Sequence, residues 1–179
     1  MSADSDGIKY ISGALSPRVI YDYFSSKFTE VRADYLEDKD TDICVGMTFP
    51  RLSKVVGGWK RDMLVKVDDE DKVVGVLKFS LSALDSVLEI SMDVLCSVRK
   101  GVGKELIDIM KAFVRQEVTI KSIYLMPDND GLIKYYESRG FRGDERSMMW
   151  EPSYGGTRKR RLRRKRRGKT YKKRIGRFL

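Results

Sequence analysis

A basic, glycine-containing turn is the part of this sequence best suited to bind a phosphate group. Arg99 and Lys100 stand just before Gly101 and Gly103, after an apolar run that ends at Val94. A strand, a glycine turn and a helix in this order present backbone N–H groups and the positive end of a helix to an anion. Glycine suits such a turn because a Cβ would hold the anion away from the backbone. The pattern favours a phosphate site, although strand-to-helix turns with two glycines also occur without a ligand.

The segments on either side of this turn have the periodicity of a strand and of a helix. Residues 86–94 alternate between apolar and polar side chains, which predicts a strand with two unlike faces. The expected apolar face comprises Leu88, Ile90, Met92 and Val94, and the polar face comprises Glu89, Ser91 and Asp93. Residues 104–114 carry apolar side chains at helical spacing, which predicts a helix packed on a core.

Other segments complete a mixed α/β pattern. Ser16 and Pro17 have the types expected at the N-cap and first position of a helix. Strands are expected at 8–11, 63–67, 73–81 and 120–125, short final strands around 141 and 148–150, a short helix at 129–139, and a loop with a short helix at 43–59. A strand–helix–strand crossover beside antiparallel strands predicts a mixed, mostly antiparallel sheet with helices on both faces.

The charges divide the chain into two parts. From Arg158 onward, the 179-residue chain has 14 lysine and arginine residues and no acidic residue. The other 22 of its 36 basic residues stand against 26 acidic ones, which gives the first part a net charge of −4. We therefore expect one folded domain over residues 1–154 and a disordered basic tail over residues 155–179.

Several classes of site and location are excluded or disfavoured by the composition. Histidine is absent, which rules out a histidine base, a Ser-His-Asp triad and histidine-containing zinc sites. The two cysteines, Cys44 and Cys96, form no C-x-x-C pair, which argues against a disulfide scaffold and suits a reducing compartment. Cys96 is expected to pack without chemistry, since no basic partner activates it. No apolar run reaches about 18 residues, and the acidic start is unlike a secretory leader, so we expect an intracellular protein in the cytoplasm or nucleus.

A segment downstream of the turn resembles a signature of the GNAT N-acetyltransferase superfamily, N-x-x-A-x-x-x-Y-x-x-x-G-F. Asn129, Tyr136, Gly140 and Phe141 stand at its matching positions, and Leu132 replaces the alanine. The resemblance covers roughly residues 63–150. It implies a GNAT-like fold and acetyl-CoA as co-substrate.

The glycine turn resembles the same family's acyl-CoA pyrophosphate loop, Q/R-x-x-G-x-G/A. The family's Arg or Gln position is Val98 here, and Arg99 lies one residue closer to the glycine. Either Arg99 takes the role in a shorter loop, or no side chain is needed there. The resemblance implies coenzyme binding by Arg99, Lys100, Gly101, Val102, Gly103, Lys104 and Asn129. It also implies that the pantetheine arm lies between two diverging strands, 92–94 and 123–125, near Met92 and a main-chain N–H at Val94.

The resemblance also implies the catalytic groups. Tyr136 is the implied general acid, since a phenol of pKa about 10 suits protonation of a thiolate whose conjugate acid lies near 8–9. Glu89 and Asp93 are two candidates for the base that takes the amine proton, through a water. A tyrosine packed in the core and a solvated strand face are the alternatives without catalysis, and many members of the family have no dedicated base.

The acceptor implied by the resemblance is a primary amine, either a small polyamine or a protein lysine or N-terminus. The acidic stretches 37–42 and 68–71, with Glu89 and Asp93, favour a cationic acceptor. A catalytically degenerate structural protein that associates with nucleic acid is the alternative function, and the departure at Val98 favours it.

The tail over residues 157–179 needs its own interpretation. A flexible polycation binds nucleic acid by counterion release, without sequence preference. A nuclear localisation signal and binding to an anionic membrane surface are alternatives. The tail also resembles basic C-terminal tails on proteins of large DNA viruses, which would place the protein in a host cell or a virion.

Overall fold

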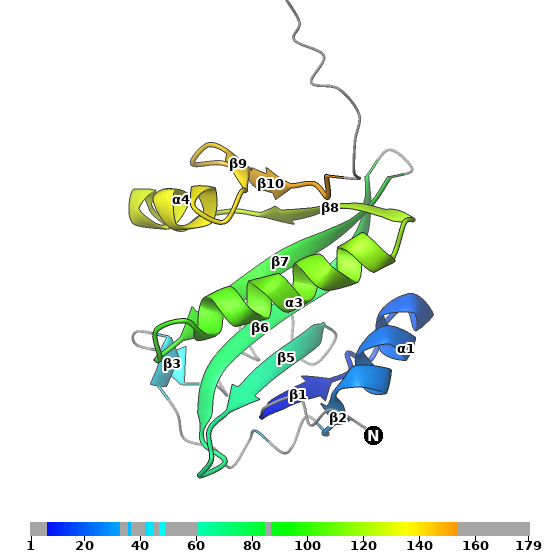
Figure 1. Cartoon of the computed structure of the whole chain (residues 1–179), viewed down its shortest axis with the longest axis vertical. Coiled ribbons are helices and arrows are strands. Elements are labelled where there is room, and N and C mark those ends of the chain that lie inside the picture. The colour runs from blue at the N-terminus through cyan, green and yellow to red at the C-terminus, as the bar shows by residue number, and fades with distance from the viewer. Residues whose placement is uncertain are drawn as a thin grey trace, which may run out of the picture.

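The computed structural model describes residues 7–32, 36, 42–44, 47–48, 61–84 and 87–153. Within these residues, the main sheet has eight strands in the order β2-β1-β5-β6-β7-β8-β10-β9 (Figure 1). Its strands are β1 (Ile8–Ile11), β2 (Thr29–Glu30), β5 (Asp62–Val67), β6 (Val73–Leu84), β7 (Val87–Ser97), β8 (Ile120–Leu125), β9 (Arg142–Gly143) and β10 (Met148–Trp150). The helices are α1 (Arg18–Lys27), α3 (Val102–Gln116) and α4 (Asp130–Glu137). The predicted basic tail, residues 155–179, lies outside the described residues.

The pairing of the strands is mixed and mostly antiparallel. The pairs β1–β2 and β7–β8 are parallel, and the other neighbours in the main sheet are antiparallel. Helix α3 connects the parallel strands β7 and β8, as a parallel pair requires a long crossover. The mixed, mostly antiparallel sheet predicted from the sequence is confirmed.

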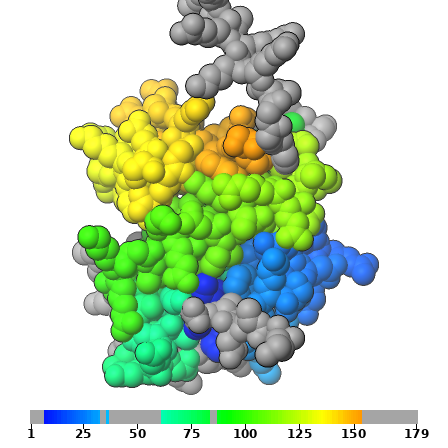
Figure 2. Space-filling view, viewed as in Figure 1, coloured from blue at the N-terminus to red at the C-terminus, as the bar shows by residue number. Residues whose placement is uncertain are grey.

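The helices pack on one face of the sheet and share one apolar core. Figure 2 shows α1, α3 and α4 on the same face of the molecule. Phe24 of α1 and Phe113 of α3 are fully buried there, with ring centroids 5.0 Å apart. Complete burial of such a side chain contributes about 1.5–3 kcal/mol to stability. These contacts hold α3 in a fixed position over the strands.

The opposite face of the sheet has a smaller core, which includes Leu36, Val65 and Val76. A helix layer was expected on this face as well. Leu36 is the described residue of the loop region that packs there, and the remainder of residues 33–41 lies outside the description.

Helix α1 begins differently from the prediction. Pro17, in extended conformation, is the N-cap and Arg18 is the first helical residue, so Ser16 does not cap the helix. The Ser16 hydroxyl instead lies 3.2 Å from the Tyr10 hydroxyl, which donates to Asp62 at 2.6 Å. The buried Asp62 carboxylate therefore orders the loop before α1, and burial raises its pKa.

Two further expectations need correction. Residues 42–48 contain two short antiparallel strands, β3 (Asp42–Cys44) and β4 (Met47–Thr48), where a loop with a short helix was predicted; residues 49–60 lie outside the described part. Cys96 is disulfide-bonded, so the expectation that it only packs, without any chemistry, was wrong. In the part of the chain described here, none of the helices is long and apolar enough to span a membrane.

Candidate active site

The parallel strands β7 and β8 run together and then part. Their register extends from Leu88 opposite Ile120 to Met92 opposite Leu125, where β8 ends. Strand β7 continues to Ser97, paired on its other side with β6. Among the described strands, none pairs with the β8-facing edge of β7 beyond Met92. The parting therefore leaves an open strand edge that leads to the glycine turn before α3.

A β-bulge lies on β7 at this parting. Lys78 is opposite Val94 and Phe79 is opposite Met92, so Asp93 is the extra residue. After the bulge, Leu95 packs against the main core with Met92, which reverses the alternation expected from the sequence. Val94 therefore does not share the face of Met92. The pattern could not reveal this, because a bulge depends on the partner strand.

The turn before α3 exposes unpaired backbone donors. Gly101 is the N-cap of α3 with φ +97°, a conformation that favours glycine, and a Cβ there would meet nothing within 4 Å. Its helix has no side-chain cap. The Val102 N–H donates to the Arg99 carbonyl at 3.4 Å, whereas the N–H groups of Gly103 and Lys104 lack an acceptor among the described residues. The N–H of Val98 donates to Val74 at 3.0 Å and fixes the start of the turn. The turn thus has N–H donors without acceptors, and its start is held against β6.

The basic side chains of the turn differ in their surroundings. Arg99 forms an ion pair with Asp68 at 2.6 Å. Lys104 pairs with Asp108 at 2.7 Å. Lys100 is exposed and forms no ion pair within the described ranges. Lys100 is therefore the cation of the turn that remains available to an anion.

The two other predicted residues of the turn are buried in packing contacts. Val102 is 8% exposed, and its Cγ1 would lie 2.3 Å from a Cβ on Gly75, so it anchors α3 on β6. Gly103 is buried where a Cβ would lie 2.9 Å from the Tyr135 hydroxyl and 3.4 Å from the Ser97 hydroxyl. The second glycine is thus required by close packing of α4 against the turn.

Helix α4 holds the predicted acid and its own cap. Tyr136 is buried, with its ring centroid 5.6 Å from that of Phe141 and 5.2 Å from that of Tyr135. Burial raises the pKa of Tyr136 to about 12, and its hydroxyl has no hydrogen-bond partner in the described part of the chain. Asn129 is the N-cap of α4 and accepts a hydrogen bond from Leu132 N–H at 3.1 Å. Its side-chain oxygen is thereby engaged in ordering the helix.

The two candidate bases share the face of β7 opposite α3, but their contacts differ. Glu89 accepts a hydrogen bond from Ser122 at 2.8 Å, in the paired part of β7 and β8. Asp93 Oδ1 accepts one from Ser91 at 3.1 Å, at the bulge. Asp93 Oδ2 lies 3.5 Å from Arg61 Nε but, among the described residues, makes no hydrogen bond although it is buried. Of the two candidate bases, Asp93 has a buried carboxylate oxygen that can still accept a hydrogen bond.

A cavity lies beside Arg61, the ion-pair partner of this carboxylate. It has a volume of about 320 Å³ and is lined by Leu15, Pro17, Arg61, Asp62, Ser80 and Leu81. Arg61 connects the cavity to the bulge, since it donates a hydrogen bond to Ser80 and pairs with Asp93. Lys78 is fully buried nearby, where burial lowers its pKa and the charge of Asp93 opposes this effect. Two cationic side chains thus flank Asp93.

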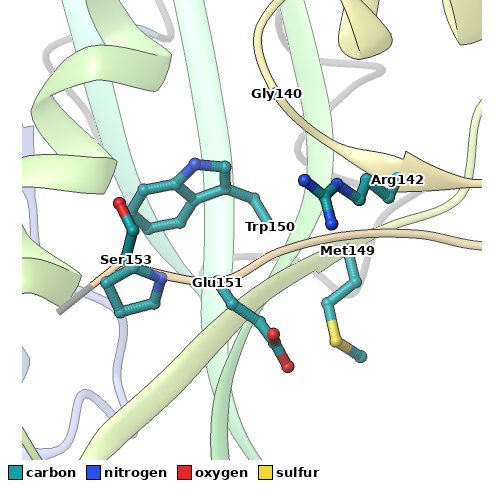
Figure 3. Close-up of a pocket in the computed structure, with 7 residues that line it drawn as sticks. Gly140, Arg142, Met149, Trp150, Glu151 and Ser153 are labelled. Carbon is teal, nitrogen blue, oxygen red and sulfur yellow. The ribbon is translucent and has the colours of Figure 1, made fainter. Parts of the chain in front are cut away.

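A second cavity, of about 550 Å³, lies at the end of β10. Its lining includes Arg142, Glu151 and Trp150 (Figure 3). Lys111 and Arg115 of α3 lie 5.0 and 5.2 Å from the Trp150 ring centroid, so the indole is packed under cations as well as against the core. These contacts hold β10, the last described strand, against α3.

Of the two acidic stretches predicted to attract a cationic acceptor, only 68–71 has described side chains. Asp68 is at the tip of the β5–β6 hairpin and pairs with Arg99. The side chains of residues 37–42 lie outside the description. Sequence reasoning missed Arg61, Ser122 and the pairing of Asp68, because each acts through a partner on another strand or turn and no local pattern marks it.

Comparisons with known proteins agree with this architecture. The model of the acetyltransferase (GNAT) family matches residues 19–141. A crystal structure of a bacterial toxin is 14% identical with a TM-score of 0.51, covering 64% of this chain and 83% of the toxin. AtaTR bound with AcCoA is 17% identical (TM-score 0.47, 64% and 88% covered), and a putative acetyl transferase from Pyrococcus furiosus is 19% identical (TM-score 0.43, 47% and 60% covered). No curated protein matched the chain. At 14% identity, the likeness to the bacterial toxin supports the fold alone.

Proposed function

Because the chain belongs to the acetyltransferase (GNAT) family, we propose that it transfers an acetyl group from acetyl-CoA to a primary amine. The observation that carries this proposal is the parting of β7 from β8 beyond Met92, directly beside the glycine turn. When bound, acetyl-CoA supplies an activated acetyl thioester. The described residues fit it, since a strand edge and uncapped helix N–H groups are open at one place.

Binding of the coenzyme would use backbone more than side chains. The leading N–H groups of α3 and the ammonium group of Lys100 suit a pyrophosphate. The open edge of β7, residues 93–97, suits the amides of a pantetheine arm, which would add to the sheet as a further strand. Gly103 lets Tyr135 of α4 pack close to the start of α3, beside this open edge.

Tyr136 would donate a proton to the leaving thiolate. Its raised pKa of about 12 keeps the phenol protonated at neutral pH, which an acid requires. Among the described residues, its hydroxyl has no competing hydrogen-bond partner. These properties support the role that the family resemblance implies.

Asp93 is the better candidate for the base. It lies at the bulge where β7 and β8 part, and its Oδ2 is buried without a hydrogen bond from any described residue. Glu89 lies in the paired part of the strands and is engaged by Ser122. Directly or through a water, the Asp93 carboxylate would accept the proton that the amine loses.

The acceptor would approach from the cavity beside Arg61. The cationic side chains of Arg61 and Lys78 offset the charge of Asp93, so this approach is less anionic than the sequence indicated. With Asp62 also in the cavity lining, two basic and two acidic side chains leave little net negative charge to attract a polycation. The charges therefore favour a protein lysine or N-terminus over a small polyamine.

Isothermal titration of the full chain with acetyl-CoA tests the proposal. We expect saturable binding by the parent, and loss of binding in Gly101→Asp, which puts a carboxylate where the pyrophosphate would lie. Gly101 has open space around its α-carbon, so a fold check by melting temperature separates loss of the site from strain at φ +97°. A product-resolved acetylation screen with polyamines and peptides then identifies the acceptor.

A structural protein that associates with nucleic acid is the second candidate function. It is favoured by the 14 basic residues from Arg158 onward and by Val98 at the family's Arg/Gln position. A chain that binds nucleic acid in a salt-sensitive manner but fails to bind acetyl-CoA would support this candidate. The viral resemblance and the intracellular location remain predictions from the sequence.

A further inference from the structure

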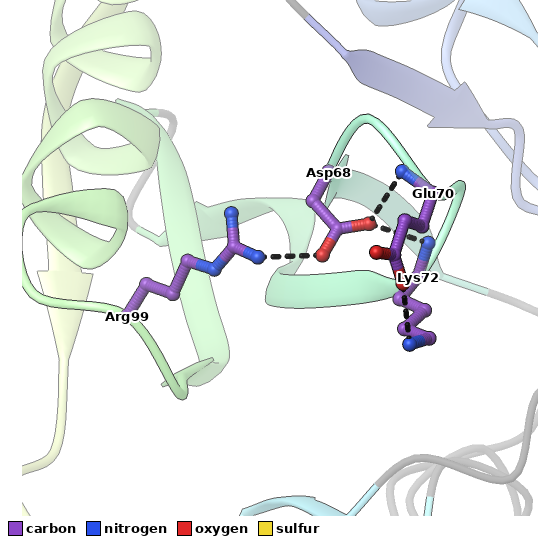
Figure 4. A network of polar contacts seen from close by, with 4 residues as sticks. All are labelled: Asp68, Glu70, Lys72 and Arg99. Carbon is purple, nitrogen blue, oxygen red and sulfur yellow. Dashed lines mark hydrogen bonds and ion pairs between the residues drawn. The ribbon is translucent and has the colours of Figure 1, made fainter.

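An ion pair joins the glycine turn to a hairpin distant in sequence. Arg99 Nη2 lies 2.6 Å from Asp68 Oδ2, at the tip of the β5–β6 hairpin (Figure 4). The Asp68 side chain is 8% exposed and that of Arg99 is 60% exposed. The guanidinium is thus directed toward the hairpin by a carboxylate that is itself well enclosed.

The hairpin holds this carboxylate in place. Asp68 Oδ1 accepts hydrogen bonds from Glu70 N–H at 3.1 Å and from Lys72 N–H at 2.9 Å. The Lys72 N–H bond is the main cause of a lowered pKa for Asp68, helped by Glu70 N–H and by the charge of Arg99. Asp68 is therefore an oriented, ionised anchor for Arg99.

A second ion pair joins the same two regions. Lys66 of β5 lies 3.0 Å from Glu105, in the first turn of α3. The two pairs therefore attach the hairpin to the residues just before and just inside the start of α3.

We propose that Arg99 is a positioning residue, which holds the coenzyme turn on the hairpin through Asp68, and that Lys100 is the side chain that contacts the pyrophosphate. This inference rests on the proposed function. It resolves the departure at Val98 in a different way from either sequence alternative, since the arginine acts on the turn instead of on the coenzyme.

The ion pair between Arg99 and Asp68 predicts a specific effect on coenzyme binding. If the turn is already ordered in the free protein, coenzyme binding does not lose free energy in ordering it. Loss of the Arg99–Asp68 ion pair should therefore weaken acetyl-CoA binding by about two- to fivefold, the size expected for one partly exposed ion pair, and leave kcat unchanged.

A double-mutant cycle with Asp68→Asn and Arg99→Gln tests the inference. Asparagine retains the oxygen that accepts from the Glu70 and Lys72 N–H groups, so the hairpin should keep its fold. We expect each single variant to raise the Kd and KM of acetyl-CoA to a similar degree, and the double variant to be no worse than either. Asp22→Asn, which breaks an exposed ion pair with Arg18 on α1, is the charge-matched control and should leave binding unchanged.

Amide hydrogen exchange of the coenzyme-free protein gives a second readout. The N–H groups of Val102 and Glu105, which donate to the carbonyls of Arg99 and Gly101, should exchange faster in Asp68→Asn and in Arg99→Gln. Lys100→Gln should weaken binding without changing their exchange. Weaker binding in Arg99→Gln with unchanged or tighter binding in Asp68→Asn would show that Arg99 contacts the coenzyme directly. Unchanged binding in both variants would show that the pair has no role. Either result overturns the inference, whereas failure of the parent to bind acetyl-CoA overturns the proposed function instead.

Discussion

The hydroxyl oxygen of Tyr135 lies 2.9 Å from the position that a Cβ on Gly103 would occupy. Arg139 holds the tyrosine there, with its guanidinium carbon 3.5 Å from the ring centroid. The two positions of the turn thus favour glycine for different reasons. Gly101 supplies a positive φ in open space, and Gly103 allows α4 to close against the start of α3.

The first prediction follows from this contact. Gly103→Ala should lower the free energy of unfolding by about 1 kcal/mol, near the lower end of the cost of overpacking because the tyrosine ring can tilt. Tyr135→Phe removes the oxygen and should restore most of that loss when combined with Gly103→Ala. Chemical denaturation measures both effects. Gly101→Ala is the control, since its strain lies in φ and Tyr135→Phe should not relieve it; equal losses at Gly103 in both backgrounds would contradict the contact.

The second prediction concerns the proposed acid. Tyr136→Phe removes a hydroxyl without a described hydrogen-bond partner, so the fold and the binding of acetyl-CoA should be retained. Turnover should fall by about 10²–10⁴-fold, the usual effect of losing a general acid. Tyr23→Phe, a buried tyrosine of α1, is the matched control and should keep parental turnover. Parental turnover in Tyr136→Phe, with chemistry shown to limit the rate, would remove Tyr136 from the mechanism.

The third prediction concerns alkaline pH. The pKa of Tyr136 rises from 10.0 to about 12 in the folded protein, so folding favours the neutral phenol. Its contribution to stability is complete below pH 10 and is lost as the pH rises to about 12. The free energy of unfolding should therefore fall less over this range in Tyr136→Phe than in the parent. The pKa of Tyr10 is also raised, so part of the alkaline loss should remain; an identical loss in both proteins would be inconsistent with the raised pKa of Tyr136.

Local patterns predicted most of the elements that surround the site. The apolar period of residues 104–114 lies within α3, and the acidic turn at 68–71 joins β5 to β6. The divergence near Met92 was expected from the family resemblance and agrees with the register of β7 and β8. The helix and the turn depend on neighbours within a few residues, which the sequence displays directly, whereas the divergence of the strands was expected only from the resemblance.

The contacts that shape the site depend on tertiary register instead. The bulge at Asp93 arises because β6 and β7 differ by one residue in their pairing, which neither strand shows alone. Arg99 and Asp68 are 31 residues apart, and Arg61 reaches Asp93 from the start of β5. A charge pattern in the sequence does not tell which partners the fold brings together.

The fourth prediction distinguishes the two carboxylates. Asp93→Asn should lower kcat by about 10²-fold or more near neutral pH, and the deficit should shrink at higher pH as more free amine becomes available. Glu89→Gln keeps an oxygen that can accept from Ser122 and should change kcat only a few-fold. Rates across a pH series, with melting temperatures for both variants, decide this. A larger loss in Glu89→Gln would reverse the assignment.

The last prediction concerns the basic tail: removal of residues 157–179 should leave the domain folded and active on a small amine, while salt-sensitive binding to nucleic acid is lost. Trp150 and Pro152 are buried, so the cut falls beyond the last described packing contacts. The remaining domain has a net charge of −4 and should be repelled by nucleic acid, whereas the full chain should bind with a steep loss of affinity between about 50 and 200 mM salt. Melting temperature, small-amine turnover and a salt series on both forms test this. Unfolding on truncation would show that the tail docks on the domain, and affinity that survives truncation would move the nucleic-acid surface to the domain itself.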